Sequence, residues 1–405
     1  MTSDEQVLSY PLHYDTALDP PKEWEDLRGR CPVATIELPS GDRAKMITRH
    51  EDIKALLADP RFARPTAADN AARVAPEGSG GAAATGDSAM VVPMKGEGHL
   101  RWRRLVGKYF TARRMAALRP SMTATAEHLI DEMVAEGAPA DLKAALSFPL
   151  PVYVICDMLG VPADDRHRFS RWSDMMLSVT RYSQEEARAG MAEFSAYMSG
   201  HIADKRAGDT DDLIGMLIRE SAGEGQGMSD AELLSTAMGL LVAGHETTAN
   251  AIGKMVAMLL ADRGRWERLV ADPSLVRTAV EESLRYDVNL GFGLRRYLSE
   301  EAELGGEVLP AGTTVLCAMG SGNRDESVFE HAGEMDLGRS PNPHLTFGAG
   351  PHSCLGQALA RTELQVALET LLRKLPTLEL AVPPADLKRM EGLLVGGLQE
   401  VPVRW

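Results

Sequence analysis

The segment 229–262 most constrains how this chain can fold, because it has the pattern of one helix of unusual length. Ser229 and Glu232 form a capping box, in which each side chain accepts a hydrogen bond from a free backbone N–H group at the start of a helix. No proline follows before Asp262, so the helix spans about 30 residues, whereas helices average about 11–12. A helix this long and this apolar has to cross the middle of the molecule.

Several other segments have helical spacing and residues that favour helices. They lie at 121–136, 164–179, 184–205, 211–220 and 355–374, and a further helix begins at Asp272-Pro273. The β-prone sequence is limited to a hairpin at 34–38 and 44–48, a second hairpin around Gly305-Gly306, and a strand at 313–318. Because no internal repeat or linker divides the chain, we expect one large, mainly α domain with a minor β part over residues 1–405.

Charge and composition exclude several functional classes. The chain of 405 residues has a formal net charge of −15, so we expect no nucleic-acid partner, because phosphate is repelled overall. The amino terminus does not resemble a signal peptide, and no stretch approaches the roughly 18 apolar residues of a membrane span. We expect a cytoplasmic protein without a membrane anchor. The four cysteines form no CxxC pair, which argues against a zinc site or a disulfide framework.

The residues 347–356, FGAGPHSCLG, carry the most chemical information. Gly348, Gly350 and Pro351 predict a tight irregular turn in which backbone N–H groups converge. Cys354 then falls at the start of a helix, where free N–H groups and partial positive charge lower the pKa of a thiol. The resulting thiolate is a good axial ligand for heme iron and favours cleavage of the O–O bond.

The order of residues in this loop resembles the heme-binding loop of the cytochrome P450 family, FGxGxHxCxG. It matches at every fixed position, including Phe347, Gly348 and Gly356. The resemblance covers nearly the whole chain and is strongest to the bacterial members that lack a membrane anchor. It implies the cytochrome P450 fold, heme b (iron protoporphyrin IX) as the cofactor and Cys354 as the iron ligand.

A second informative motif, Ala243-Gly244-His245-Glu246-Thr247, lies in the middle of the long helix. Ala243 and Thr247 are four residues apart and share a face, and small residues such as Gly244 let a flat ligand approach the backbone. A positioned acid and alcohol deliver the two protons that reductive cleavage of O2 requires. The segment resembles the family's AGxET motif, which implies catalytic roles for Glu246 and Thr247 in monooxygenation.

Glu282 and Arg285 are three residues apart and share a helix face. They resemble the family's ExxR element, in which the pair is joined by an arginine that precedes the cysteine loop. Arg339 occupies that position here. The resemblance implies a buried charge network that holds the heme-binding core, in which loss of one member leaves the others unpaired.

Heme carries two propionates, which require cations. His99 and Arg103 share a helix face, Arg296 lies after the long helix, and His352 lies within the cysteine loop; all four match positions that bind propionates in the family. Residues 94–98 depart from the family's acidic, proline-containing pattern. They end the Ala-, Gly- and Pro-rich loop 63–98, which we interpret as a functional lid.

Two electrons are needed for each turnover, and no segment resembles a flavin-, nicotinamide- or iron–sulfur-binding site. A basic cluster could dock an acidic ferredoxin by charge steering, and its members are Arg101, Arg104, Lys108, Arg113 and Arg114. Bacterial relatives use a ferredoxin and a ferredoxin reductase, which favours docking over the alternative of a solvated surface.

Family resemblance places substrate contacts in the lid loop, in the helices around 169–196, on the long helix near Leu240 and Ala243, and in the segment 288–294. The candidate pocket residues are Leu240, Val288, Asn289, Leu290 and Phe292. We expect a heme-thiolate monooxygenase that uses O2 to oxidise a small metabolite in a secondary-metabolite or antibiotic pathway. Oxidative C–C or C–O coupling and ring closure remain an alternative on the same heme. A non-catalytic heme-thiolate sensor is a second alternative, although such a protein needs no acid and alcohol for proton delivery.

Overall fold

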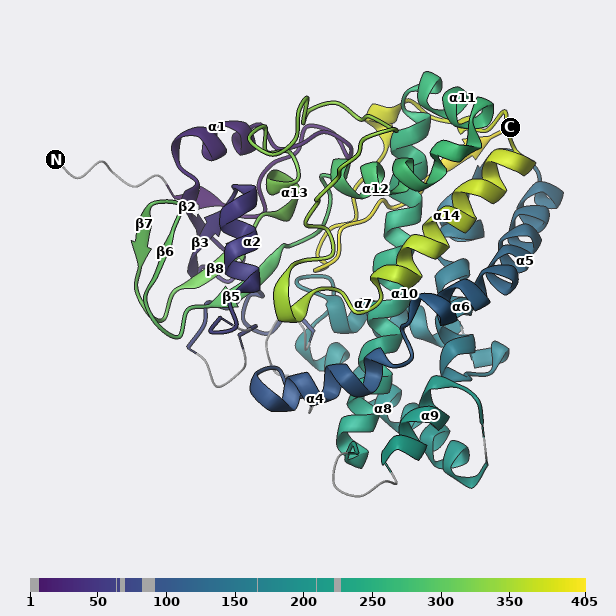
Figure 1. Cartoon of the computed structure of the whole chain (residues 1–405), viewed down its shortest axis with the longest axis horizontal. Helices are drawn as coiled ribbons and strands as arrows, with labels where there is room; N and C mark the ends of the chain where they lie inside the picture. Colours follow the sequence, from purple (N-terminus) through teal and green to yellow (C-terminus); the bar gives the residue numbers. More distant parts are fainter. Residues whose placement is uncertain are drawn as a thin grey trace.

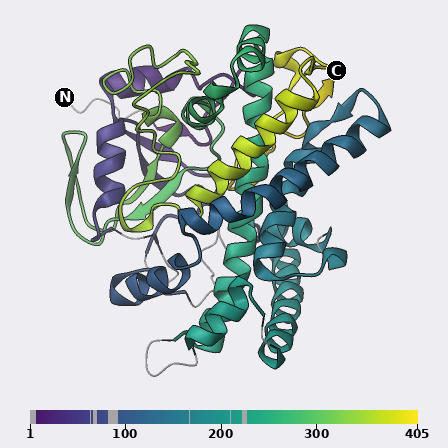
Figure 2. The same ribbon diagram turned by 45° about the vertical axis from the view of Figure 1, so that its right-hand side comes forward.

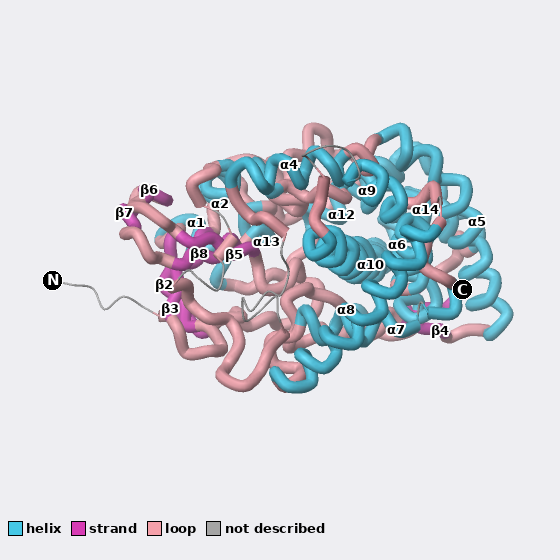
Figure 3. Tube along the Cα trace, turned by 90° about the horizontal axis from the view of Figure 1, so that it is seen from below, coloured by secondary structure: helices cyan, strands magenta, loops and turns pink. Residues whose placement is uncertain are grey.

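The structure is a computed structural model that describes residues 7–62, 64–65, 70–81, 92–165, 167–208, 210–221 and 227–405. Helices occupy most of the molecule; most strands gather on the side that carries the amino terminus, whereas one small sheet lies near the carboxy terminus (Figures 1 and 3). The expected fold class, mainly α with a minor β part, is confirmed. None of the described helices combines the length and the apolar character that crossing a bilayer would require.

Helix α10 (Asp230–Leu260) runs through the middle of the helical part (Figures 1 and 2). The expected capping box is present at its start: Ser229 accepts from the Glu232 N–H, and Glu232 accepts from the Ser229 N–H. Most of its side chains are buried, which confirms that this helix crosses the core. Helix α10 packs against several other helices, among them α6 (Pro149–Leu159), α8 (Gln184–Ala207) and α14 (Gln357–Lys374).

The remaining helices surround this centre. Their bounds are α1 (Glu23–Arg30), α2 (His50–Ala58), α4 (Gly96–Gly107), α5 (Ala112–Glu136), α7 (His167–Leu177), α9 (Leu213–Ser221), α11 (Arg263–Ala271), α12 (Val276–Tyr286) and α13 (Met319–Gly322). A short π-helical turn, η1 (Lys143–Ser147), connects α5 to α6. The most extensive contact between two helices is made by α5 and α14, which lie side by side in Figures 1 and 2.

The strands form one main sheet and two small ones. The main sheet has the order β1 (Leu8–Ser9), β2 (Val33–Glu37), β3 (Arg43–Ile47), β8 (Thr314–Cys317), β5 (Leu294–Tyr297). Its β2–β3 hairpin pairs Val33 with Ile47, and β3 runs parallel to β8, so the sheet joins the two ends of the chain. The hairpin β6 (Ala302–Leu304) with β7 (Glu307–Leu309), and the sheet of β4 (Ala140–Asp141), β10 (Pro402–Arg404) and β9 (Glu379–Leu380), complete the β part.

Helix bounds differ from the sequence-based expectation in two instructive places. Helix α5 begins at Ala112 and continues through Pro120, although proline lacks the N–H that an interior helical position donates. Packing along α14 outweighs that local loss. Helix α6 was not expected, because its sequence, PLPVYVICDML, is apolar all round and shows no amphipathic period; its side chains are buried on most faces.

The loop 63–98 is described only in part. Residues 63, 66–69 and 82–91 of this expected lid lie outside the described residues. In the part that is described, Gly80 and Gly81 donate to the carbonyls of Tyr182 and Ser178, between α7 and α8. The loop is therefore fastened at that point to the connection between these two helices.

Candidate functional site

The cysteine loop folds back on itself immediately before α14. Gly348 and Gly350 adopt φ of +68° and +67°, a conformation that glycine tolerates best. A Cβ on Gly350 would lie 2.5 Å from the Ala58 Cα of α2, so this glycine also permits close packing. The Cys354 N–H donates to the Phe347 carbonyl over 2.7 Å, which closes the loop. Cys354 remains accessible in the protein chain alone, although neighbouring groups partly desolvate its thiol.

The environment of the thiol differs from the expectation. Helix α14 begins at Gln357, so Cys354 precedes the helix instead of lying in its first turn. Burial raises the pKa of the Cys354 thiol, while the Gly356 N–H and the Arg103 charge act in the opposite direction. The expected acidic thiol is therefore wrong for the protein chain alone. A coordinated metal cation deprotonates a thiol outright, so iron itself would supply the missing stabilisation.

Cationic and imidazole side chains from distant segments surround this loop. The His99 ring, on α4, stacks on the His352 ring with centroids 4.2 Å apart. Arg103 donates to the Ser353 carbonyl over 2.7 Å. Arg296, on β5, is only 1% exposed, and its Nε has no hydrogen-bond partner among the described residues. The four residues expected to bind an anion thus lie in one region.

The pKa shifts show that this cluster is not neutralised. Burial lowers the pKa of His352 to about 3, with contributions from His99 and Arg296, and lowers the pKa of Arg296 to about 10. Burial and the Arg103 charge lower the pKa of His99. No carboxylate of the described residues forms an ion pair with Arg103 or Arg296. Because buried charges require a partner, the arrangement fits an anionic ligand such as the two carboxylates of heme.

Arg64 belongs to the same cluster and was not predicted. Its charge acts on Cys354 and on Arg103, and burial lowers the pKa of its guanidinium. Arg64 lies in the Ala-, Gly- and Pro-rich loop, which also contains Arg73 and Lys95, so its charge alone did not distinguish it. No helical or strand spacing relates it to the other members, so the sequence offered no stronger signal.

One face of α10 is open in the centre of the molecule. Ala243 and Thr247 are both exposed, although the helix around them is largely buried. The Thr247 hydroxyl donates to the Ala243 carbonyl over 2.9 Å. Gly244 has a different role from the expected one, because a Cβ there would meet the Ile155 side chain at 2.8 Å. Its absent side chain admits α6, whereas Ala243 lies on the open face.

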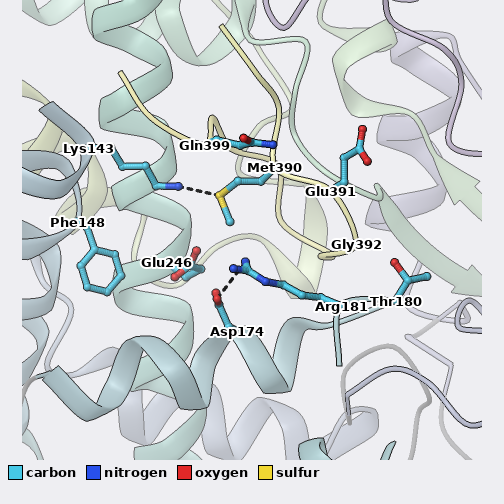
Figure 4. Close-up of a pocket in the computed structure, with 10 residues that line it drawn as sticks. All are labelled: Lys143, Phe148, Asp174, Thr180, Arg181, Glu246, Met390, Glu391, Gly392 and Gln399. Atoms are coloured by element: carbon cyan, nitrogen blue, oxygen red, sulfur yellow. Dashed lines mark hydrogen bonds and ion pairs between the residues drawn. The ribbon is translucent and has the colours of Figure 1, made fainter. Parts of the chain in front are cut away.

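Glu246 lines a separate pocket of about 570 Å³ (Figure 4). Its Oε1 accepts a hydrogen bond from Asn250 over 3.0 Å, whereas its buried Oε2 accepts no hydrogen bond from a described residue and lies 3.6 Å from the His245 Nε2. Asp174 and Arg181 form an ion pair of 3.1 Å across the same pocket. Burial raises the pKa of Glu246, and the nearby cations only partly oppose this. A carboxyl group with a raised pKa that lines a pocket large enough for water is suited to carrying a proton.

Glu282, Arg285 and Arg339 form one network beneath the cysteine loop. Arg285 binds both carboxylate oxygens of Glu282 at 2.8 and 2.7 Å, and both residues are 0% exposed. The Arg339 Nε lies 3.2 and 3.1 Å from the same two oxygens. Arg285 also donates to the carbonyls of Asn323 and Ala332, which precede the cysteine loop. The network therefore joins α12 to the segment that leads into this loop.

The candidate substrate residues lie in different environments. Val288, Asn289 and Phe292 are buried, and Val288 and Phe292 pack within the core that the amino-terminal segment shares. The Asn289 side chain donates to the Gly397 carbonyl. Leu290 and Leu240 are only half-buried. Of the five candidates, Leu290 and Leu240 are therefore the side chains that remain accessible to a ligand.

The basic cluster is partly neutralised within the chain. Arg101 pairs with Glu232, and Lys108 pairs with Glu220. Arg114 stacks on the Tyr109 ring. The other two members, Arg104 and Arg113, are exposed and form no ion pair with a described residue.

Comparison with known proteins identifies this arrangement. The cytochrome P450 family model matches residues 187–395. Nocardicin C N-oxygenase of Nocardia uniformis subsp. tsuyamanensis is 42% identical, and the match covers 98% of each chain. Mycinamicin IV hydroxylase/epoxidase of Micromonospora griseorubida is 40% identical over 100% of both chains. The putative thioether synthase SgvP, involved in the tailoring step of griseoviridin, matches with a TM-score of 0.92 and 36% identity, covering 99% of this chain and 100% of its own. Agreement at this identity over the full length shows that the chain is a bacterial-type heme monooxygenase and belongs to the cytochrome P450 family.

Proposed function

We propose that this protein inserts one oxygen atom of O2 into a small secondary metabolite, by hydroxylation or epoxidation. Cys354 ligates the heme iron, and His99, Arg103, Arg296, His352 and, in addition, Arg64 hold the propionates. Heme, when bound, supplies the centre that activates O2. The overall reaction consumes substrate, O2, two electrons and two protons, and releases oxidised substrate and water.

Proton delivery is the part of the reaction that this chain's own residues perform. Glu246 accepts a proton from water in the pocket of Figure 4 and passes it toward the open face of α10, where the Thr247 hydroxyl lies. Burial favours the neutral, proton-carrying form of Glu246. We expect Glu246→Gln, which retains the Asn250 contact, to lower O2-dependent turnover about 100-fold. Glu391→Gln, an exposed carboxyl of the same pocket, is the matched control and should have little effect.

One observation carries the proposal: an accessible thiol faces a cluster of unneutralised cations in the middle of the protein. Cys354→Ser should abolish the red-shifted absorption band of the CO-bound ferrous protein and the turnover with it. Cys31→Ser, which changes another accessible free cysteine, should leave both unchanged. Retention of the band and of turnover in Cys354→Ser would refute the assignment.

We propose a ferredoxin with its reductase as the electron donor, and a cytoplasmic location where both are available. Helix α4 lies directly against the cysteine loop, since Arg103 binds the Ser353 carbonyl. Arg104, on the same helix, and Arg113 are the exposed unpaired cations of this surface. Their charges suit an acidic partner that must approach the heme closely.

Charge reversal tests this docking surface. Arg104→Glu/Arg113→Glu should slow reduction by ferredoxin about tenfold at low salt and leave the CO-bound spectrum unchanged, because steering acts on the rate of encounter. The control, Arg43→Glu/Lys388→Glu, reverses two exposed cations on other elements. Equal reduction rates for both double variants would exclude docking at α4.

A bond-forming reaction is a second candidate, because the similar structure SgvP is described as a putative thioether synthase. The two reactions differ in the fate of oxygen. Incubation with ¹⁸O-labelled O2 places label in the product of hydroxylation or epoxidation, whereas coupling or ring closure leaves the product unlabelled.

A further inference from the structure

The segment 288–293, which connects α12 to β5, is held in place from several sides. Leu290 packs against the same buried cluster as Leu294 and Ala349, so this segment passes beside the cysteine loop. Because this segment is one of those expected to contact substrate, its position bears on which side chain meets a ligand. We call residues 288–293 the clamped segment.

Two tyrosines from the amino-terminal part of the chain bind its backbone. The Tyr14 hydroxyl donates to the Val288 carbonyl over 3.2 Å, and the Tyr10 hydroxyl donates to the Phe292 carbonyl over 3.1 Å. The Tyr10 and Phe292 rings also meet edge to face, with centroids 4.9 Å apart. Both ends of the clamped segment are thus fixed by residues nearly 280 positions away in the sequence.

The carboxy-terminal turn holds the segment from another side. The Phe292 N–H donates to the Leu394 carbonyl over 2.9 Å, and the Asn289 amide donates to the Gly397 carbonyl over 3.0 Å. Gly291 has φ of +89°, and a Cβ there would lie 2.2 Å from the Leu394 oxygen. Only glycine permits this backbone-to-backbone approach.

A buried lysine of α10 provides the third contact. Lys254 is 5% exposed, and its Nζ lies 2.6 Å from the Asp287 carboxylate and 2.6 Å from the Asn289 carbonyl. Asp287, in turn, accepts from the Asn289 N–H over 2.9 Å. Burying an ion pair carries a large desolvation penalty, so such a pair contributes little to stability and instead favours one arrangement over others. Here the arrangement that it fixes is the distance of the segment from α10.

In the clamped segment, the residues on both sides of Leu290 are held by these contacts. Leu290 itself is a half-buried apolar side chain. We propose that Lys254, acting through Asn289, is a positioning residue that sets Leu290 against the substrate and so determines specificity. The part of the substrate that meets Leu290 is apolar. This inference rests on the proposed function in one respect: the clamped segment has to face the heme.

The test measures how well the site distinguishes a large iron ligand from a small one. Imidazole and 4-phenylimidazole both bind heme iron through nitrogen, but only the latter reaches the surrounding walls. Their dissociation constants follow from spectral titration of the holoenzyme. Lys254→Met/Asp287→Asn removes both charges of the pair and should reduce the preference for 4-phenylimidazole about tenfold, because a displaced wall loses its packing on the phenyl ring.

A matched control separates positioning from stability. Lys205 and Asp212 form another ion pair with little exposure, between α8 and α9. Lys205→Met/Asp212→Asn should leave the ratio of the two dissociation constants unchanged, whatever its effect on the melting temperature. An equal change of the ratio in both double variants, or no change in either, would overturn the proposal.

Two further variants complete the test. In a Leu290→Ala background, the Lys254→Met/Asp287→Asn change should have no additional effect on the ratio, because its effect is exerted through Leu290. If the change still altered the ratio to the same extent in the Leu290→Ala background, the claim that it acts through Leu290 would be refuted. If the double variant does not fold, Tyr14→Phe removes one hydroxyl from the same segment and should shift the ratio about twofold in the same direction. Absence of that shift would also contradict the proposal.

Failure of the proposed function would look different from failure of this inference. A wild-type protein without the red-shifted CO band would lack thiolate ligation, whatever the ratio of ligand affinities. A normal band with an unchanged ratio in the Lys254 and Tyr14 variants would refute only the positioning role.

Discussion

Two groups of buried charges, one around Glu282 and one around His352, differ in one respect. Around Glu282, each charge has a partner within the chain: the carboxylate binds Arg285 and Arg339. Around His352, the charges have the same sign, and Arg296 leaves its Nε without a partner. The first group is complete as it stands, whereas the second is complete only with an anion. An unneutralised group of cations therefore indicates a ligand site, and a neutralised one indicates architecture.

Glu363 limits this rule to cations. Like Glu282 it is 0% exposed, and neither carboxyl oxygen makes a hydrogen bond with a described residue, although the Thr248 hydroxyl is close. Burial raises the pKa of Glu363 well above its usual value, so this group loses its charge by binding a proton. An arginine cannot do so at neutral pH and needs an anion instead.

The largest effect is expected at the neutralised group. Glu282→Ala leaves two buried guanidinium groups unpaired and should lower the free energy of unfolding by about 3–5 kcal/mol. Urea denaturation followed by circular dichroism measures this change. Glu267→Ala removes an exposed ion pair with Arg263 and should cost at most about 0.5 kcal/mol. Comparable losses in the two variants would show that burial of the network is unimportant.

An intermediate effect is expected at the cation cluster, and it should fall on heme retention. Arg296→Met removes a buried cation that has no carboxylate partner, so transfer of heme to apomyoglobin should be about 10- to 100-fold faster. Arg43→Met, an exposed arginine of the same sheet, serves as the control. An unchanged transfer rate for Arg296→Met would mean that this cluster does not bind the anionic part of the cofactor.

The smallest effect is expected at Glu363 and depends on pH. Because the folded protein holds the Glu363 proton more tightly than the unfolded chain, stability is greatest below the unfolded pKa and falls as pH rises toward the folded pKa. Glu363→Gln should therefore match the wild type near pH 4.5 and exceed it at pH 8 by at least about 1 kcal/mol. Glu369→Gln, an exposed position on the same helix, should show no such gain. A Glu363→Gln protein that is less stable at pH 8 would show that the charged form is the favoured one.

The parts of the site that could be predicted from the sequence all depend on residues that are close together in the chain. The capping box at Ser229, the Glu282–Arg285 spacing and the turn before Cys354 each depend on residues at most a few positions apart. Helix and turn geometry convert such spacings into positions directly. The helical fold class followed in the same way, from the period of the apolar residues.

Other features could not be predicted because they join distant segments. Arg64 reaches the Cys354 region from a loop without periodic pattern, and Asp174 and Glu246 line one pocket formed by four parts of the chain. The opposite roles of Ala243 and Gly244, adjacent in sequence, depend on whether α6 or an open space lies beside each one.

The sequence by itself determined the long central helix, the cysteine turn and the residue types needed for heme and O2 chemistry, because these are properties of local geometry and of side-chain chemistry. The tertiary structure alone decided which cations remain unneutralised, which carboxyl groups have a raised pKa and which side chain of the clamped segment is only half-buried. Charge neutralisation and burial depend on neighbours, and packing brings those neighbours from anywhere in the chain.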